Sequence, residues 1–512
     1  MNDDCLVSLA LAAAARVPAR PALIDAPDGT TTSYAELADR LLRVASSLSA
    51  LGVRRGDTVA TLTPNASSWV VFSLGTMAAG CAVTGLNPLL TPEEIARQIR
   101  HSGAKLLAVA SRLLPMLEGS GLRHLVEHVI VLDVDGETSC RTLSGLVRDG
   151  RAEPVSPRPD DVALLPYSSG TSGLPKGVEV PGRSLAIAGK AAGAALGLTE
   201  ADVWLAMAPF FHIVAVSGVL ASALACGVPV VIAPGPDIEA ALAAIARYRV
   251  TMTVMTPPAL AALDRHPGLE RYDLSSLRAL GCTAAPLSAA MQTAVARRLD
   301  TTVFQAYGMT ESVGAVTLGP LAAPFPGSCG RAVPGVEVRI VDPATGHDLP
   351  RGGQGEVWAR SDCMMRGYRG DPEATAATIT ADGWLRTGDL GTLDADANLF
   401  VVDRLKELIK VGPSQVAPAE LEALLVAYPG VVDAAVVGRP AAETGECPIA
   451  FVVASQPIDA DALMAWVAGQ VAPFKRLAGV AFVERIPRLP NGKILRRLLP
   501  AGPDLGMKTV TA

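Results

Sequence analysis

The sequence has no excess of basic residues: 44 Lys and Arg stand against 50 Asp and Glu, giving a formal net charge of −6. Nucleic-acid-binding proteins normally carry a net basic field or stripe, so the charge balance argues against that class. Only 18% of the residues are charged, whereas 50% are hydrophobic. This composition excludes a disordered chain and predicts large buried cores.

The sequence also has no cysteine pairs at metal-binding or redox spacing. Its 8 cysteines are scattered, with no Cys-x-x-Cys pair and no Cys/His cluster at zinc-ligand spacing. They indicate reduced thiols and therefore a cytoplasmic protein. Residues 1–20 begin with acidic side chains where a secretory signal is basic, and they predict an amphipathic helix instead.

One long stretch contains almost no charge. Between Val203 and Pro236, His212 is the only side chain that could carry a formal charge, and the stretch exceeds the length of a membrane span. Several prolines and glycines interrupt it, however, and its pattern divides into a helix over about 213–225 and the β-branched strand VPVVI. We expect a helix and a strand of a buried α/β core and no membrane span.

The order of the remaining patterns predicts an α/β fold with two domains. β-branched runs such as DTVATLTP, KLLAVA and TMTVMTP alternate with apolar helical segments, which favours mainly parallel sheets with helices on both faces. Gly-punctuated alternation over residues 327–402 predicts a β-rich subdomain. The predicted domains are 1–402, which is large, and 403–512, a small mobile α+β domain.

The segment YSSGTSGLPKGVE, residues 167–179, directly follows a predicted strand. Its glycines and small hydroxylated residues let backbone N–H groups approach an anion closely, and Lys176 adds a positive charge, so we expect a phosphate-binding loop. The spacing differs from that of a Walker loop. A Ser/Gly turn without a ligand and an amidase-like serine hydrolase are weaker alternatives, the second because no catalytic lysine is suitably placed upstream.

This loop is one of several motifs by which the sequence resembles the adenylate-forming superfamily of acyl- and aryl-CoA ligases, luciferases and peptide-synthetase adenylation domains. Within the superfamily it is most similar to 4-coumarate–CoA ligase-type enzymes. The motifs that carry the resemblance occur in the expected order along nearly the whole chain: LNPLLTPEEIARQIRHSGAKLL (86–107), PFFHIVA (209–215), CTAAPLS (282–288), QAYGMTES (305–312), GWLRTGDLG (383–391), DRLKELIKVGPSQVAPAELE (403–422) and PNGKILRR (490–497).

The resemblance implies an acid–thiol ligase that uses ATP, Mg²⁺ and CoA. A carboxylate attacks the α-phosphorus of ATP, pyrophosphate leaves, and CoA then takes the acyl group from the acyl-AMP. Such chemistry depends on neutralising charge. The implied partners are therefore a small carboxylic acid, ATP and CoA, with no nucleic acid, in a monomer or homodimer.

The resemblance also assigns roles to individual residues. Lys493 would bridge the attacking carboxylate and the α-phosphate, and His212 would lie beside the acid. Tyr307 would face adenine, Thr310 the α-phosphate, and Glu311 would bind Mg²⁺. Asp389 and Arg404 would hold the ribose, and Asp403 would be the hinge between the domains. The phosphate loop would be formed by Ser168, Ser169, Gly170, Thr171, Ser172, Gly173 and Lys176, and the other implied cofactor-binding residues are Ala284, Ala285, Pro286, Gln305, Ala306, Gly308, Met309, Lys410 and Gln415.

Two regions depart from the family pattern. Pro413 stands where relatives carry a glycine, in a loop expected to line the pantetheine tunnel, and it lacks a backbone N–H. An adenylating enzyme that passes acyl-AMP to a carrier protein or a separate thiolation enzyme is therefore the main alternative. The expected acid pocket differs at Val214, Gly218, Thr283, Gly314 and Ala315, which favours a larger or more apolar acid than a hydroxycinnamate.

Two other functions are less favoured. A luciferase-type monooxygenase shares these motifs. A non-catalytic binding module of the same fold would be expected to lose Lys493 or Glu311, and the sequence has both.

Overall fold

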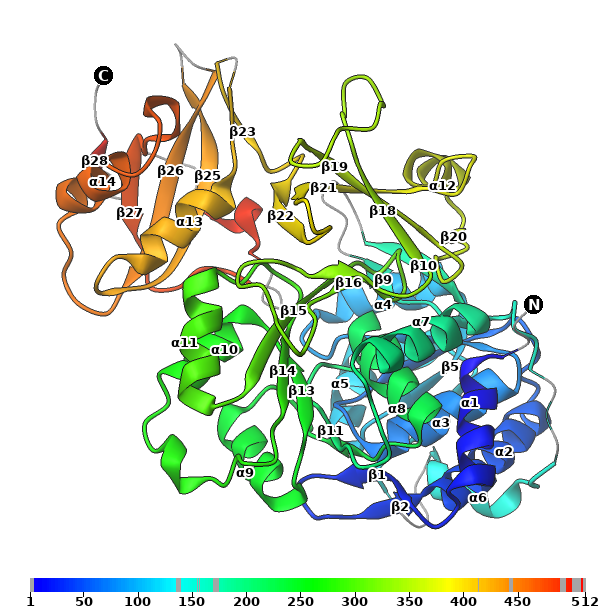
Figure 1. Ribbon diagram of the computed structural model, residues 1–512. Coiled ribbons are helices and arrows are strands. Elements are labelled where there is room, and N and C mark those ends of the chain that lie inside the picture. The colour runs from blue at the N-terminus through cyan, green and yellow to red at the C-terminus, as the bar shows by residue number, and fades with distance from the viewer. Residues whose placement is uncertain are drawn as a thin grey trace.

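The computed structural model describes residues 4–134, 140–153, 155, 157–168, 175–412, 414–441, 445–488, 494–499 and 508–509. A large α/β body, a smaller β sheet and a C-terminal α/β unit follow one another along the chain (Figure 1).

The first sheet of the body is parallel over most of its width. Its strand order is β17-β16-β15-β14-β13-β11-β12-β1-β2, and every pair from β15 to β1 is parallel. The carboxyl ends of these strands therefore meet at one edge, where α/β folds bind ligands. The strands are β1 (Pro21–Asp25), β2 (Thr31–Ser33), β11 (Trp204–Ala206), β12 (Val230–Ile232), β13 (Met252–Met255), β14 (Ala279–Cys282), β15 (Thr302–Gly308), β16 (Ala315–Leu318) and β17 (Arg331–Ala332).

The second sheet combines a parallel centre with an antiparallel edge. Strands β3 to β8 pair in parallel, and β10 adds antiparallel pairs with β8, β9 and β20. The strands are β3 (Thr58–Leu62), β4 (Ala82–Gly85), β5 (Ala104–Val109), β6 (His128–Val131), β7 (Arg141–Thr142), β8 (Val162–Leu164), β9 (Tyr167–Ser168), β10 (Lys176–Pro181) and β20 (Gly367–Tyr368).

Helices cover both faces of both sheets. One core contains residues of both sheets together with α1 (Leu6–Arg16), α2 (Tyr34–Ala50), α3 (Ser67–Ala78), α7 (Gly182–Ala195), α8 (Ala221–Cys226) and the π-helix η3 (Val214–Leu220). The outer face of the first sheet packs on α9 (Ile238–Tyr248), α10 (Pro257–Asp264) and α11 (Ala289–Leu299). The outer face of the second packs on α4 (Pro92–Ser102) and α5 (Leu114–Ser120), and α6 (Leu143–Asp149) lies against α2. The result is five alternating layers of helices and sheets.

Two smaller sheets follow. The β-rich part has the antiparallel order β18 (Val336–Val341), β19 (Gln354–Ser361), β21 (Leu385–Leu393) and β22 (Leu399–Arg404), with α12 (Pro372–Thr378) between β20 and β21. The C-terminal unit contains β23 (Ile409–Val411), β24 (Ser414–Val416), β25 (Val431–Ala441), β26 (Gly445–Ala454), β27 (Gly479–Phe482) and β28 (Lys508–Thr509), with α13 (Pro418–Ala427) and α14 (Ala460–Ala468).

The α/β class is confirmed, as are the helix near the N-terminus and the strand after Gly227. The charge-free stretch forms η3, α8 and β12, so the helix expected over 213–225 starts as a π-helix. Among the described residues, no helix is both long and apolar enough to cross a bilayer. The division into domains at residue 402/403 stays a prediction.

Candidate active site

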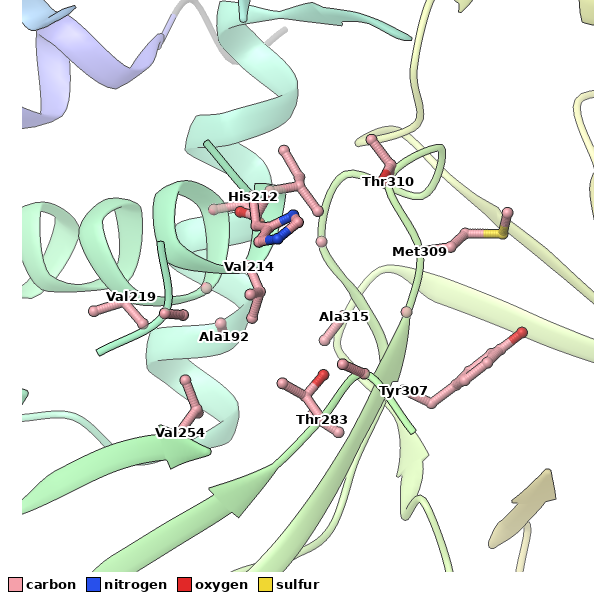
Figure 2. Close-up of a pocket in the computed structure, with 18 of the residues that line it drawn as sticks. Ala192, His212, Val214, Val219, Val254, Thr283, Tyr307, Met309, Thr310 and Ala315 are labelled. Carbon is pink, nitrogen blue, oxygen red and sulfur yellow. The ribbon is translucent and has the colours of Figure 1, made fainter. Parts of the chain in front are cut away.

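A cavity of about 290 Å³ opens at the carboxyl edge of the first sheet. Residues that follow β11, β13, β14 and β15 line it, together with residues of α7 and η3. Figure 2 shows His212 and Thr310 toward one end, Val254 and Thr283 toward the other, and Val214 and Ala315 across the middle.

Tyr307, Asp389 and Arg404 form a connected group, of which Tyr307 and Arg404 line the cavity. The Tyr307 hydroxyl donates to Asp389 Oδ2 at 2.7 Å, and Arg404 Nε lies 3.0 Å from Asp389 Oδ1. Asp389 on β21 and Arg404 on β22 are directly paired across the antiparallel sheet, which places their side chains together. Burial and the Asp389 carboxylate raise the pKa of Tyr307 well above its ordinary value, so its hydroxyl stays protonated and donates.

A second group connects Glu311 to Lys176. The Tyr368 hydroxyl donates to Glu311 Oε1 at 2.8 Å, and the Lys176 ammonium lies 4.9 Å from the centre of the Tyr368 ring. Lys176 Nζ is also 3.4 Å from the carboxylate of Asp371. Glu311 is only 4% exposed and lines the cavity, as Thr310 does. A buried carboxylate is the hard oxygen ligand that Mg²⁺ prefers, so Glu311 fits a magnesium site.

His212 is the one imidazole that lines the cavity among the described residues. Its Nε2 is buried and has no hydrogen-bond partner among the residues that the structure describes. Burial lowers the pKa of His212 to about 4, so the ring is neutral at neutral pH. An unpartnered buried nitrogen is costly unless a ligand satisfies it, which fits a polar group of a bound molecule at this end of the cavity.

The structure brings most of the residues expected at the site together. Those that line the cavity are Ser168, His212, Ala284, Ala306, Tyr307, Gly308, Met309, Thr310, Glu311 and Arg404. Asp389 contacts two of them, and Lys176 reaches Glu311 through Tyr368.

The other expected residues lie elsewhere. The Gln305 side chain faces away from the cavity, because its amide is bonded to both the N–H and the C=O of Leu287. Ala285 and Pro286 follow Ala284 but do not line the cavity, and Lys410 pairs with Gln415 in the C-terminal sheet. Ser169, Gly170, Thr171, Ser172, Gly173, Pro413 and Lys493 lie outside the described residues.

Tyr368 is a site residue that the sequence did not reveal. It belongs to no expected motif and lies 57 positions from Glu311 along the chain. The antiparallel pairing of β20 with β10, which sets Tyr368 opposite Val178, brings it to the site. No local sequence signal encodes that pairing.

We expect Glu311 to bind Mg²⁺, and removing the Tyr368 hydroxyl should weaken that binding. Tyr368→Phe leaves the ring under Lys176 and removes the hydroxyl, with its bond to Glu311 and its contact with Thr378. We therefore expect the Mg²⁺ concentration for half-maximal activity to rise about 3- to 10-fold. Tyr248→Phe is the matched control, because its hydroxyl bonds to the Ala26 carbonyl instead. An unchanged Mg²⁺ titration in Tyr368→Phe would contradict the assigned contact.

Comparisons with known proteins agree with this geometry. The model of the AMP-binding enzyme family matches residues 11–369, and that of the AMP-binding enzyme C-terminal domain matches residues 420–493. A 4-coumarate–CoA ligase 2 of Oryza sativa subsp. japonica is 40% identical, covering 96% of this chain and 91% of its own length.

Two solved structures are similar over nearly the whole chain. The anthranilate CoA ligase AuaEII in complex with anthranoyl-AMP has a TM-score of 0.89 at 28% identity, covering 97% of this chain and 96% of that one. The O-succinylbenzoate CoA synthetase MenE of Bacillus subtilis, in complex with ATP and magnesium ion, has a TM-score of 0.84 at 29% identity, covering 96% and 98%. The chain belongs to the AMP-binding enzyme family, and it is an ATP-dependent acid–CoA ligase that activates its acid as an acyl-adenylate.

Proposed function

We propose that this ligase activates a bulky, apolar monocarboxylic acid. The observation that carries the proposal is the lining of the cavity. Among the described lining residues, the only formally charged side chains are Glu311 and Arg404, and His212 is neutral at neutral pH. The rest of the wall is mostly apolar, including Leu196, Trp204, Met207, Val214, Val219, Val254, Phe304 and Leu318. A second carboxylate deep in this cavity would be buried without a charged partner, at high cost.

The nucleotide would occupy the polar end. We assign the adenosine to Tyr307, Asp389 and Arg404, since a carboxylate can accept hydrogen bonds from both ribose hydroxyls. Thr310 would face the α-phosphate, and Ser168 and Lys176 the β- and γ-phosphates. Glu311 would hold Mg²⁺, which neutralises phosphate charge during displacement. Lys176 must exchange its contact with Asp371 for a phosphate when the nucleotide binds.

The acid would enter with its carboxylate beside His212. The neutral imidazole can donate one hydrogen bond to this carboxylate and orient it toward the α-phosphorus. The carboxylate oxygen attacks phosphorus, the bond to pyrophosphate breaks, and acyl-AMP forms. In the second step the CoA thiol attacks the acyl carbon and AMP leaves. Lys493, placed between the two anions of the first step, would lower its barrier.

A rotation of the C-terminal unit about Asp403 would separate the two steps. Asp403 accepts the backbone N–H of Arg404 at 2.7 Å and that of Ala419, near the start of α13, at 2.9 Å. Burial raises the pKa of Asp403 to about 6. Hinges concentrate their movement in a few residues at the ends of elements, and Asp403 lies next to the last residue of β22.

A carrier protein or a separate thiolation enzyme is the second candidate acceptor. Pro413 is the residue that favours it, since a proline supplies no backbone N–H at a position where relatives are expected to carry a glycine. Parallel measurement of pyrophosphate, AMP and acyl-CoA release separates the possibilities. Acyl-CoA formed at the rate of pyrophosphate release supports CoA as the acceptor, whereas pyrophosphate release without acyl-CoA supports the carrier.

A panel of acids in the ATP–pyrophosphate exchange assay tests the proposed substrate class. The panel pairs each apolar acid with an analogue of equal length that bears a terminal carboxylate, and it includes p-coumarate. We expect each apolar acid to exceed its charged analogue in kcat/KM by at least about 100-fold, because burying an unpaired charge costs several kcal/mol. Clear preference for p-coumarate or for a dicarboxylate would contradict the proposal.

Val254→Phe should shorten the cavity from its far end. Val254 lies on β13, lines the cavity and is 8% exposed. We expect the larger side chain to raise KM for the longest accepted acid about 10-fold or more, and to leave a short acid such as acetate or butyrate nearly unaffected. No change for either acid would show that the acid does not reach β13, and equal losses for short and long acids would show that the substitution disturbs the part of the site that both share.

A further inference from the structure

Val313 has an unusual backbone conformation at the centre of the site. Its φ is +61°, in the left-handed region that β-branched residues rarely adopt. The residue is 1% exposed and lies two positions after Glu311, in the segment between β15 and β16. Such strained positions persist only where neighbouring contacts hold them, and they concentrate at functional sites.

Ser217 supplies one such contact. Its buried hydroxyl lies 2.6 Å from the Val313 carbonyl oxygen and 2.9 Å from the Ile213 carbonyl oxygen of its own helix. A hydroxyl carries one proton, and the shorter distance assigns that proton to Val313. The bond joins residues 96 positions apart, so it connects η3 to the segment that carries Thr310 and Glu311.

The rest of this segment is tightly held. The Ser312 hydroxyl accepts from the Met309 N–H at 3.0 Å and contacts the Gly314 carbonyl oxygen at 2.8 Å, and the Glu311 carbonyl accepts from Met365 N–H. At Gly314, an added Cβ would lie 2.8 Å from the Ala188 Cβ, so α7 packs closely behind it. The φ of Val313 therefore sets the direction of the backbone between Glu311 and Gly314, both of which neighbouring residues hold in place.

The position of Ser217 on a π-helix is also informative. π-turns are rare and often occur at functional sites. Val214, Ser217 and Gly218 of η3 all line the cavity proposed for the acid. The same helical segment therefore forms the acid's wall and holds the Thr310–Glu311 segment through one hydrogen bond.

We propose that Ser217 is a positioning residue, which sets Thr310 and Glu311 for MgATP by holding Val313 in the left-handed conformation. This inference rests on the roles proposed above for those two residues. Ser217 does not itself need to touch the nucleotide. The effect of removing the Ser217 hydroxyl should therefore depend on the residue at position 313. Valine disfavours the left-handed conformation and needs the hydrogen bond, whereas glycine adopts that conformation without strain.

The test is a double-mutant cycle with Ser217→Ala, Val313→Gly and the combined variant, reading KM for MgATP in pyrophosphate exchange with the wild type's best acid. We expect Ser217→Ala to raise this KM about 5- to 10-fold. In the Val313→Gly background the same change should raise it less than about twofold. An equal rise in both backgrounds, or no rise in either, would overturn the proposal.

Ser222→Ala is the matched control. Ser222 lies in α8, is fully buried, and its hydroxyl bonds only to the helix carbonyls of Gly218 and Val219 among the described residues. It should lower thermal stability much as Ser217→Ala does without changing KM for MgATP. If Ser217→Ala does not fold, Ser217→Cys, with its weaker donor, should give an intermediate KM, and a KM equal to wild type would again refute the role.

A failure of the proposed substrate class can be distinguished from a failure of the positioning role of Ser217. If no apolar acid supports exchange, the wild type itself is inactive with them, and the cycle is run with whichever acid does. The positioning role fails when wild-type exchange is measurable and the effect of Ser217→Ala is the same with valine and glycine at position 313, or when Ser217→Cys, used because Ser217→Ala does not fold, has the KM of the wild type.

Discussion

Glu311→Gln is expected to lower the rate of ATP–pyrophosphate exchange by about 10²- to 10³-fold. Glutamine keeps the length of the side chain and can still accept the hydrogen bond from Tyr368, so the local packing is preserved. What is lost is the negative charge that a Mg²⁺ ligand supplies. Raising the Mg²⁺ concentration should restore part of the activity, since the ion still binds the phosphates.

A buried glutamate away from the cavity provides the comparison. Glu356 is 9% exposed, accepts hydrogen bonds from Trp358 and Gly388, and does not line the cavity. Glu356→Gln should cost stability and leave the Mg²⁺ dependence unchanged. Exchange within tenfold of wild type in Glu311→Gln, with an unaltered Mg²⁺ titration, would show that this carboxylate is not the metal ligand.

The sequence predicted the strands of the body well where they are buried on both faces. TMTVMTP and DTVATLTP contain β13 and β3, since parallel strands between two helix layers form continuous runs of buried residues. Strands β4 (AVTG) and β11 (WLA) were not expected, because they are only four and three residues long and WLA contains no β-branched residue. Their pairing comes from the neighbouring strands.

The individual motifs predicted Tyr307, Asp389 and Arg404 as site residues but not the contacts between them. Tyr307 and Asp389 lie 82 positions apart, and their hydrogen bond depends on how the small antiparallel sheet packs against β15. The Asp389–Arg404 ion pair depends on the register of β21 and β22. A motif names residue types at a spacing, whereas a contact between motifs requires the tertiary packing.

Motif membership also failed to predict which way a side chain points. Gln305 lies in the same motif as Tyr307, yet its amide is bonded to Leu287 and Gln292 and holds the Ala284–Leu287 segment in place. Successive residues of a strand face opposite sides, so Gln305 points away from the cavity that its neighbours Phe304 and Ala306 line. Alternation alone would turn Tyr307 the same way as Gln305, but Tyr307 lines the cavity near the end of β15, where the pairing with β16 shifts register. The sequence predicted a helix at 213–225 but not that it begins as the π-helix η3. An extra residue in one turn leaves no clear periodicity in the sequence.

Lys493→Ala is expected to reduce acyl-AMP formation by about 10³-fold or more, because no other cation is expected between the acid carboxylate and the α-phosphate. Nucleotide binding should change little, since Tyr307, Asp389 and Arg404 are unaffected. The second step brings a neutral acyl carbon to the thiol and joins no two anions, so chemically supplied acyl-AMP should still react with CoA at close to the wild-type rate. Pyrophosphate exchange and thioester formation, measured separately, distinguish the steps.

The control for Lys493 is a lysine on the surface of the body. Lys105 Nζ lies 3.0 Å from Asp57, and Lys105→Ala removes the same side chain from a site that does not line the cavity. It should leave both half-reactions intact. If Lys493→Ala lowered both half-reactions equally, the lysine would act through the stability or placement of the C-terminal unit. If it lowered neither, the cation that brings the two anions together must come from another residue, and Lys176 would be the first to test, because its ammonium lies over the Tyr368 ring, whose hydroxyl contacts Glu311.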